Sequence, residues 1–179
     1  MSSPEIYKKQ NSFVDIRHHK KFEDIIPQIR NLKNNLHLLS LPGYKRDIIR
    51  SACVELLGEE SIEKGIKPFQ LYSFNLDEIN RIDDTDLPRY LYYRYRYEIF
   101  PQRLQLDDFP PCLQIESASI CNYRCLFCYQ VDEEFTRKSN GMMGRMSLDL
   151  FKRPIDQAEG KCEAVTLASR GALLVWPRH

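Results

Sequence analysis

The sequence predicts an α/β protein in two parts: a small amino-terminal α/β segment with a linker over residues 1–110, and the start of a second α/β layer over 111–179. Two observations carry this prediction. In the first part, apolar residues recur at helical spacing in some segments and form short unbroken runs in others. In the second part, two strand-like segments flank a loop and a helix, which is the order of a βαβ unit. The composition, 42% apolar and 28% charged, is typical of globular proteins.

The first part is expected to alternate helices and strands. The predicted helices cover 22–33, 44–57 and 61–64, and the predicted strands cover 35–42 and 68–74. Pro27 lies early in the first helical pattern, and Gly58 follows the second helix as a glycine C-cap. Both strand predictions rest on short apolar runs, the first of which is closed by Pro42 and Gly43. This order predicts a small α/β layer with its two strands parallel.

The acidic segment 75–86 predicts one or two helical turns and then a linker, but the next segment, 88–100, fits two interpretations. From 93 to 99 aromatic or apolar residues alternate with charged ones, which is strand periodicity. Pro88, shortly after Asp86, is instead a good helix start. On a helix, one face would carry Leu91, Tyr95 and Ile99. We favour the helix.

The interleaved arginines and tyrosines of 88–100 also allow two functional interpretations. They can stack on bases and contact phosphates, or they can form an amphipathic segment that buries its rings, and we favour the second. The chain has 26 Lys+Arg and 25 Asp+Glu, a net charge of +1. Because this balance creates no field that attracts polyanions, we expect neither nucleic acid nor a membrane as a partner.

The sequence predicts a cytoplasmic protein. No apolar run approaches the roughly 20 residues that a membrane-spanning helix needs. The first residues, MSSPEIYKKQ, lack the apolar core of a secretory signal. Three of the six cysteines are clustered rather than spread as in a disulfide framework, which is typical of a metal site in a reducing compartment.

The second part begins after a proline-rich connector at 101–111. A strand is predicted at 113–119, followed by a long polar loop that runs to Met146. Ser147 is a good N-cap for a helix to about 159, which Gly160 would end, and a second strand is predicted at 163–169. This order predicts a parallel pair joined by a right-handed crossover.

The polar loop carries Cys121, Cys125 and Cys128 in the spacing C-x3-C-x2-C. Three thiolates on one loop can each bind a different iron of one cubane cluster, which leaves the fourth iron open for a substrate or cofactor. The spacing differs from that of bacterial ferredoxins and lacks the paired C-x2-C of structural zinc sites. One alternative remains: a zinc ion or a closed electron-transfer cluster with Cys112 or Cys162 as fourth ligand.

The loop resembles that of the radical S-adenosylmethionine (radical SAM) enzymes, whose signature is C-x3-C-x-aromatic-C after the first barrel strand. Here Phe127 occupies the aromatic position, and the loop follows the strand predicted at 113–119. The surrounding residues, LQIESASICNYRCLFCYQ, GMMGRMSLDLFKRPIDQ and VTLAS, resemble the subgroup that often carries a carboxyl-terminal auxiliary-cluster (SPASM) domain. The implied fold is the first βαβ portion of a truncated, partial (βα)6 barrel.

The resemblance implies a mechanism and a set of site residues. Cys121, Cys125 and Cys128 would hold a [4Fe–4S] cluster whose free iron chelates S-adenosylmethionine, and Phe127 would pack beside the adenine. Reduction by a donor such as flavodoxin or ferredoxin would yield methionine and a 5′-deoxyadenosyl radical. This radical would abstract hydrogen from a peptide or a biosynthetic intermediate. The protein's part is to bind, orient and exclude water.

The chain also departs from the family. The Gly-Gly-Glu-Pro element that grips the methionine amino group after the second strand is matched by Gly171 alone, because Ala172 and Leu173 stand where Glu and Pro are expected. Pro154 falls inside the first barrel helix, where it should kink the helix or cost about 3 kcal/mol.

The resemblance covers only the last third of the chain. A strand–helix unit takes about 30 residues, so 113–179 has room for about two of six units. We therefore expect an amino-terminal fragment of a longer enzyme. Alternatively, residues 1–110 carry the biological role as a docking domain and the barrel portion is inert.

Overall fold

The computed structural model describes residues 21–59, 66–121, 123 and 125–167. The chain divides into two compact units, Met1–Leu106 and Asp107–His179, which we call unit 1 and unit 2. It is a mixed α/β protein in which helix predominates. Among the described residues, no helix is both long and apolar enough to cross a membrane.

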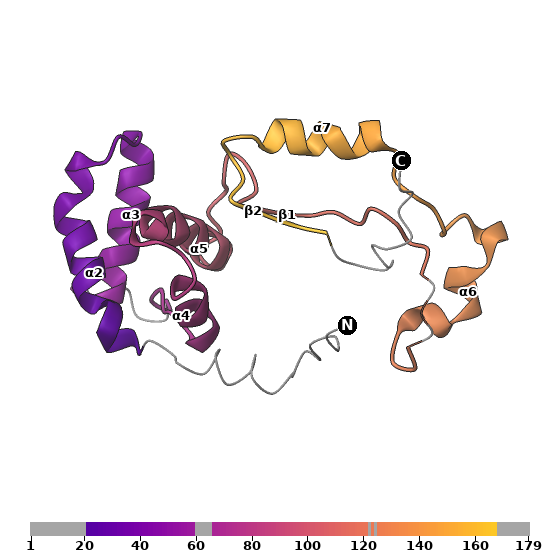
Figure 1. Cartoon of the computed structure of the whole chain (residues 1–179), viewed down its shortest axis with the longest axis horizontal. Helices are drawn as coiled ribbons and strands as arrows, with labels where there is room; N and C mark the ends of the chain where they lie inside the picture. The colour runs from indigo at the N-terminus through magenta and orange to yellow at the C-terminus, as the bar shows by residue number, and fades with distance from the viewer. Residues whose placement is uncertain (1–20, 60–65, 122, 124, 168–179) are drawn as a thin grey trace, which may run out of the picture. The chain divides into compact units, whose positions relative to one another are not determined.

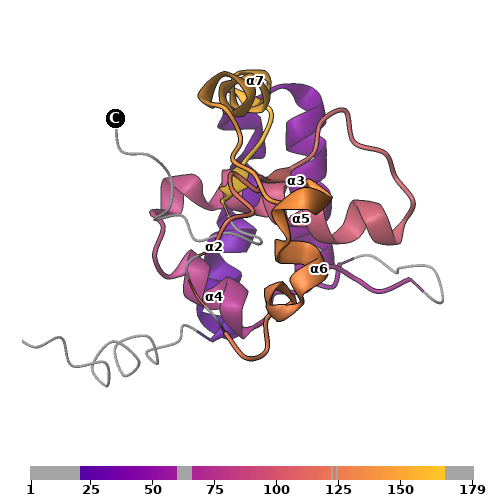
Figure 2. The same cartoon turned by 90° about the vertical axis from the view of Figure 1, so that its right-hand side faces the viewer.

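The described part of unit 1 is built from helices alone. The α-helices are α2 (Phe22–Asn35), α3 (Gly43–Leu56), α4 (Ser73–Ile79) and α5 (Leu87–Gln102), with short 3-10 helices η1 (Leu36–Leu38) and η2 (Asp84–Asp86). Helices α2 and α3 lie side by side, and α5 packs against α3 (Figures 1 and 2). The predicted α/β layer in this part of the chain is therefore wrong for the residues that are described.

One apolar core joins these helices. Its fully buried members include Ile25 and Ile29 of α2, Ile49 of α3 and Leu91 and Ile99 of α5. The predicted helices at 22–33, 44–57 and 88–100 are confirmed with small shifts at their ends. Gly58 follows α3 with φ of 64°, the left-handed conformation that favours glycine at a helix end. The predicted helix at 61–64 lies outside the described residues.

Neither predicted strand of unit 1 forms. In 35–42, α2 continues to Asn35 and then tightens into η1, so that Leu36 is buried against helices. In 68–74, Phe69 is buried, but its backbone N–H donates to Glu55 Oε2 (2.8 Å) rather than to a neighbouring strand. Short apolar runs look alike in strands and in buried irregular segments, which is why periodicity failed here.

The arginines and tyrosines of α5 pack against each other within unit 1. Leu91, Tyr95 and Ile99 are all buried along the helix, as the helical interpretation requires. The Arg94 guanidinium lies 5.3 Å from the Phe74 ring centre, and that of Arg96 lies 4.6 Å from the Tyr92 ring centre. These contacts are typical of cation–π packing.

Unit 2 contains the predicted strand–helix–strand order. Strand β1 (Cys112–Gln114) pairs in parallel with β2 (Ala164–Thr166), and Cys112 lies opposite Ala164. Between them come η3 (Tyr129–Val131), α6 (Glu133–Thr136), η4 (Lys138–Asn140) and α7 (Leu148–Ala158). Figure 1 shows α7 along one side of the strand pair. In the described residues this is one two-stranded sheet.

Strand β1 is shorter than the predicted 113–119 because the chain after it changes its partner, whereas the predicted second strand at 163–169 reaches beyond the described residues. Ile115 still donates its N–H to Thr166 O (2.9 Å), but Ala118 forms an antiparallel bridge with Arg145. Helix α7 begins as predicted, since Ser147 Oγ accepts from the Leu150 N–H (3.2 Å). Pro154 lies inside α7 without ending it. Gly160 has φ of 70° just after the helix.

Candidate metal centre

The cysteine loop starts where the chain has left β1. Residues 115–119 lead from the strand to Cys121, and the loop runs through Cys125 to Cys128 before η3 begins at Tyr129. Polar residues after the carboxyl end of a parallel strand are where α/β proteins commonly build sites. The three predicted ligands therefore share one short loop at that end of β1.

Cys121, Cys125 and Cys128 are all free thiols. None forms a disulfide; Cys125 is exposed, and Cys121 and Cys128 are half-buried. The Cys128 N–H donates to Cys125 O (3.0 Å), so these two cysteines belong to one tight turn. Cys121 Sγ accepts from the Tyr123 N–H (3.4 Å).

The loop supplies the kind of ligand that binds an iron–sulfur cluster, but its three thiols do not lie together around one point. Three free, solvent-reachable cysteines on one loop are the donors that such clusters use. Among the described residues, however, no three Cys, His, Asp or Glu side chains meet as a group that could hold a metal ion. Ligand assembly and metal binding are commonly coupled in thiolate sites, so the loop would complete its geometry on binding.

The other described cysteines of unit 2 lie away from the loop. Cys112 and Cys162 are at the amino ends of the two parallel strands, whereas the loop follows the carboxyl end of β1. The Cys162 thiol donates to Ala164 O (3.0 Å), and that of Cys112 to Leu113 O (3.9 Å). This arrangement disfavours either residue as a fourth ligand.

The two predicted cofactor-binding residues have different outcomes. The Phe127 side chain is 94% exposed, beside Leu126 at 95%. Packing of Phe127 against adenine stays a prediction. Gly171 lies outside the described residues.

Two buried polar residues flank the loop, and neither belongs to the predicted site. Ser119 precedes the first loop cysteine and Gln130 follows the last, and both are buried. The Gln130 Nε2 group donates to Ser119 O (2.7 Å). The sequence held a weak indication of a polar contact here. Ser117 and Ser119 are hydroxyl residues at positions where a buried strand would carry apolar side chains.

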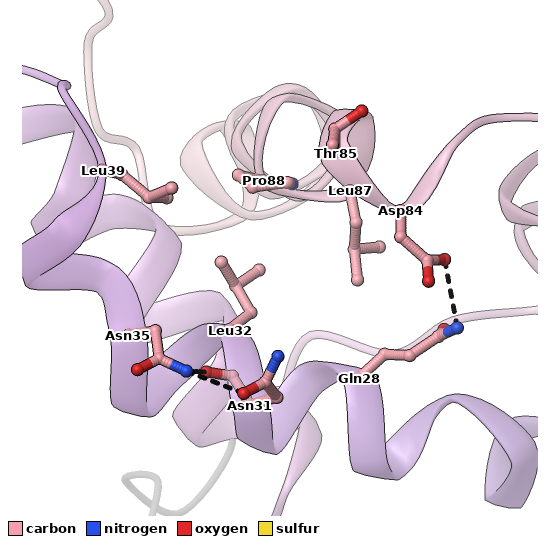
Figure 3. Close-up of a pocket in the computed structure, with 9 residues that line it drawn as sticks. All are labelled: Gln28, Asn31, Leu32, Asn35, Leu39, Asp84, Thr85, Leu87 and Pro88. Carbon is pink, nitrogen blue, oxygen red and sulfur yellow. Dashed lines mark hydrogen bonds between the residues drawn. The ribbon is translucent and has the colours of Figure 1, made fainter.

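Unit 1 has a pocket that the sequence did not reveal. It lies between α2 and the start of α5 and has a volume of about 280 Å³. Figure 3 shows the residues that line it: Gln28, Asn31, Leu32, Asn35, Leu39, Asp84, Thr85, Leu87 and Pro88. Gln28 Nε2 donates to Asp84 Oδ1 (3.1 Å), and Asn35 Nδ2 donates to Asn31 Oδ1 (2.7 Å). The spacing of the three carboxamides along one helix face could have signalled it.

No family model, no curated protein and no solved structure matches the chain in comparisons with known proteins.

Proposed function

We propose that the chain acts as a radical SAM enzyme on a peptide or a biosynthetic intermediate. The observation that carries the proposal is the loop CNYRCLFC, with three free cysteines after β1 of a strand–helix–strand unit. In this proposal, β1, α7 and β2 are the first elements of a partial (βα)6 barrel.

Cys121, Cys125 and Cys128 would each bind one iron of a [4Fe–4S] cluster, with the fourth iron left for the amino and carboxylate groups of S-adenosylmethionine. When bound, the cluster supplies the electron, received from a flavodoxin or ferredoxin, that cleaves S-adenosylmethionine to methionine and a 5′-deoxyadenosyl radical. The position of Cys112 and Cys162 at the opposite strand ends supports a three-thiolate set.

The remaining residues of the loop would bind and orient the nucleoside. The exposed Phe127 ring would cover one face of the adenine and exclude water there. Gly171 would let the backbone approach the methionine part of the cofactor closely. Because Ala172 replaces the expected glutamate, backbone carbonyls would accept hydrogen bonds from the methionine amino group.

Anaerobic reconstitution of the full chain with ferrous iron and sulfide tests the proposal. We expect the dithionite-reduced protein to give a [4Fe–4S]⁺ paramagnetic resonance signal that changes when S-adenosylmethionine is added. Cys125→Ser should abolish this signal. Cys112→Ser and Cys162→Ser are matched controls and should keep it.

Two results would overturn the proposal. One is a signal that ignores S-adenosylmethionine or requires Cys112 or Cys162, since the cluster would then be fully ligated by protein. The other is stoichiometric zinc in protein isolated without oxygen, which would indicate a zinc-binding module.

A further inference from the structure

A buried hydrogen bond closes the base of the cysteine loop. Ser119 lies two residues before Cys121, and Gln130 lies two residues after Cys128. The Gln130 side-chain N–H donates to the Ser119 carbonyl at 2.7 Å, and the two residues are 8% and 7% exposed. The contact therefore joins the chain entering the loop to the chain leaving it, out of water.

Gln130 is tied through the backbone to the second and third cysteines. It belongs to η3, whose Val131 N–H donates to Cys128 O (3.0 Å). The Cys128 N–H in turn donates to Cys125 O (3.0 Å). Two consecutive turns thus connect Cys125 and Cys128 to Gln130, and the glutamine side chain connects them to the strand that leads into Cys121.

Ser119 is a fixed anchor for this bond. Its backbone N–H donates to Gly144 O (3.0 Å), and its Oγ accepts from the Gly144 N–H (2.8 Å). One residue earlier, Ala118 bridges Arg145, and the Met146 N–H donates to Ser117 O (2.9 Å). The bonds to Gly144 would still hold Ser119 if the Gln130 bond were lost. We therefore expect that loss to free the chain around Gln130, where the loop ends, and to leave the chain at Ser119 in place.

We infer that Gln130 is a positioning residue: by closing the base of the loop, it limits how far Cys121 can move from Cys125 and Cys128, so that the three thiolates can come together on one centre. Bringing the two ends of a loop together lowers the entropy of the chain. A hydrogen bond that already joins the ends before the ligand binds reduces the entropy that is lost on binding. Without Gln130, the buried Ser119 carbonyl also loses its side-chain donor. The inference rests on the three-thiolate site of the proposed function, but not on cleavage of S-adenosylmethionine.

Arsenite binding to the reduced full-length chain tests the inference without iron, sulfide or S-adenosylmethionine. One As(OH)₃ condenses with three thiols to give As(SR)₃ and three waters, so its affinity reports how easily the three cysteines meet. Gln130→Met keeps the side-chain length but cannot donate, and we expect about tenfold weaker arsenite binding. Gln157→Met, at an exposed position of α7 in the same unit, is the matched control and should bind as the parent does.

A two-thiol probe separates positioning from a general loss of structure. In a Cys121→Ser background, phenylarsine oxide can bridge Cys125 and Cys128, whose shared turn does not involve Gln130. Addition of Gln130→Met there should leave the phenylarsine oxide affinity within about twofold. Because the Ser119 Oγ bond to Gly144 anchors the same base, Ser119→Ala should weaken arsenite binding as well.

Three outcomes overturn the inference: equal arsenite affinity of Gln130→Met and the parent chain, equal losses for both probes, or failure of the parent to bind arsenite through all three loop cysteines. These outcomes are distinct from failure of the proposed function. If the reconstituted cluster does not respond to S-adenosylmethionine, Gln130→Met can still weaken arsenite binding. If the cluster does respond, Gln130→Met can still leave arsenite binding unchanged.

Discussion

Glu55 joins three segments of unit 1 that are far apart in the sequence. Its carboxylate, only 6% exposed, accepts two hydrogen bonds from Arg103 Nη2, both at 2.9 Å. It also accepts from the Tyr95 hydroxyl and from the Phe69 N–H (2.8 Å). Helix α3, the segment before α4 and the end of α5 therefore meet at one side chain.

Glu55→Gln should destabilise unit 1 by about 2–4 kcal/mol, because the isosteric amide leaves the Arg103 guanidinium without its carboxylate partner in a partly buried site. Urea unfolding followed by circular dichroism measures the loss. The exposed pair Asp47 and Arg50 on the same helix provides the control, and Asp47→Asn should cost about 0.5 kcal/mol or less. Equal losses would mean that the buried network contributes no more than a surface pair.

Burial raises the pKa of the Cys53 thiol from its ordinary value of 9.0 to about 12. Between pH 9 and 12 the folded chain keeps this proton while the unfolded chain loses it. The stability supplied by the neutral thiol is thus complete below pH 9 and is lost as the pH rises toward 12. Burial and the contact with Glu55 also raise the pKa of Tyr95 to about 12, but from a starting value of 10.0.

The free energy of unfolding should therefore decrease less steeply between pH 9 and 10 in Cys53→Ala than in the parent chain. Tyr95 contributes little to the decrease in this range. Urea unfolding at closely spaced pH values measures the slope. Ile49→Val is the control, since it removes buried volume at a neighbouring core position without removing a titrating group. Parallel pH profiles for Cys53→Ala and the parent would contradict the assignment.

At the scale of elements, α7 shows how a local cap sets a helix start. Ser147 Oγ accepts from the Leu150 N–H, and Asp149 lies in the first turn, where a negative charge favours the helix N-terminus. Pro154, in the interior, removes one backbone donor and should weaken the same helix. The start of α7 therefore depends strongly on its cap.

Ser147→Ala should destabilise unit 2 by about 1 kcal/mol, because the side-chain acceptor at the helix start is lost. Ser147→Asp keeps an acceptor there and should retain most of the stability. Both variants can be compared by amide hydrogen exchange of the first turn of α7. If exchange in that turn is unchanged by Ser147→Ala, the cap does not determine where the helix begins.

At the scale of the whole molecule, the two units differ in how much apolar surface they bury. The apolar core described above belongs entirely to unit 1. In the described part of unit 2, the buried apolar residues are Ile115, Ala118 and Ala158. A two-stranded sheet with α7, the short α6 and so small a core is marginal by itself.

A chain of residues 1–106 should therefore unfold cooperatively, whereas a chain of residues 107–179 should not. Thermal unfolding followed by circular dichroism tests both fragments. A sharp transition in the second fragment, or none in the first, would contradict this account of where the stability resides. If three thiolates bind a centre, arsenite should add order to the second fragment, since binding energy then contributes to folding.

Sequence patterns predicted the features that depend on near neighbours. The apolar spacing of 22–33 and 44–57, the serine cap at 147 and the glycines at 58 and 160 each determine structure within a few residues. The cysteine spacing of the candidate site was equally readable, because it is a property of one loop.

Only the tertiary structure decided what the apolar runs at 35–42 and 68–74 would do. Whether such a run becomes a strand depends on a partner for its backbone, and the Phe69 N–H has a glutamate from α3 as its partner instead. The same holds for the loop base, where Gln130 meets a carbonyl eleven residues earlier in the chain. The spacing of apolar residues indicates which side of a helix or strand faces the core. Which distant backbone or side-chain group a residue contacts depends on how the elements pack, and that packing produces no repeating pattern in the sequence.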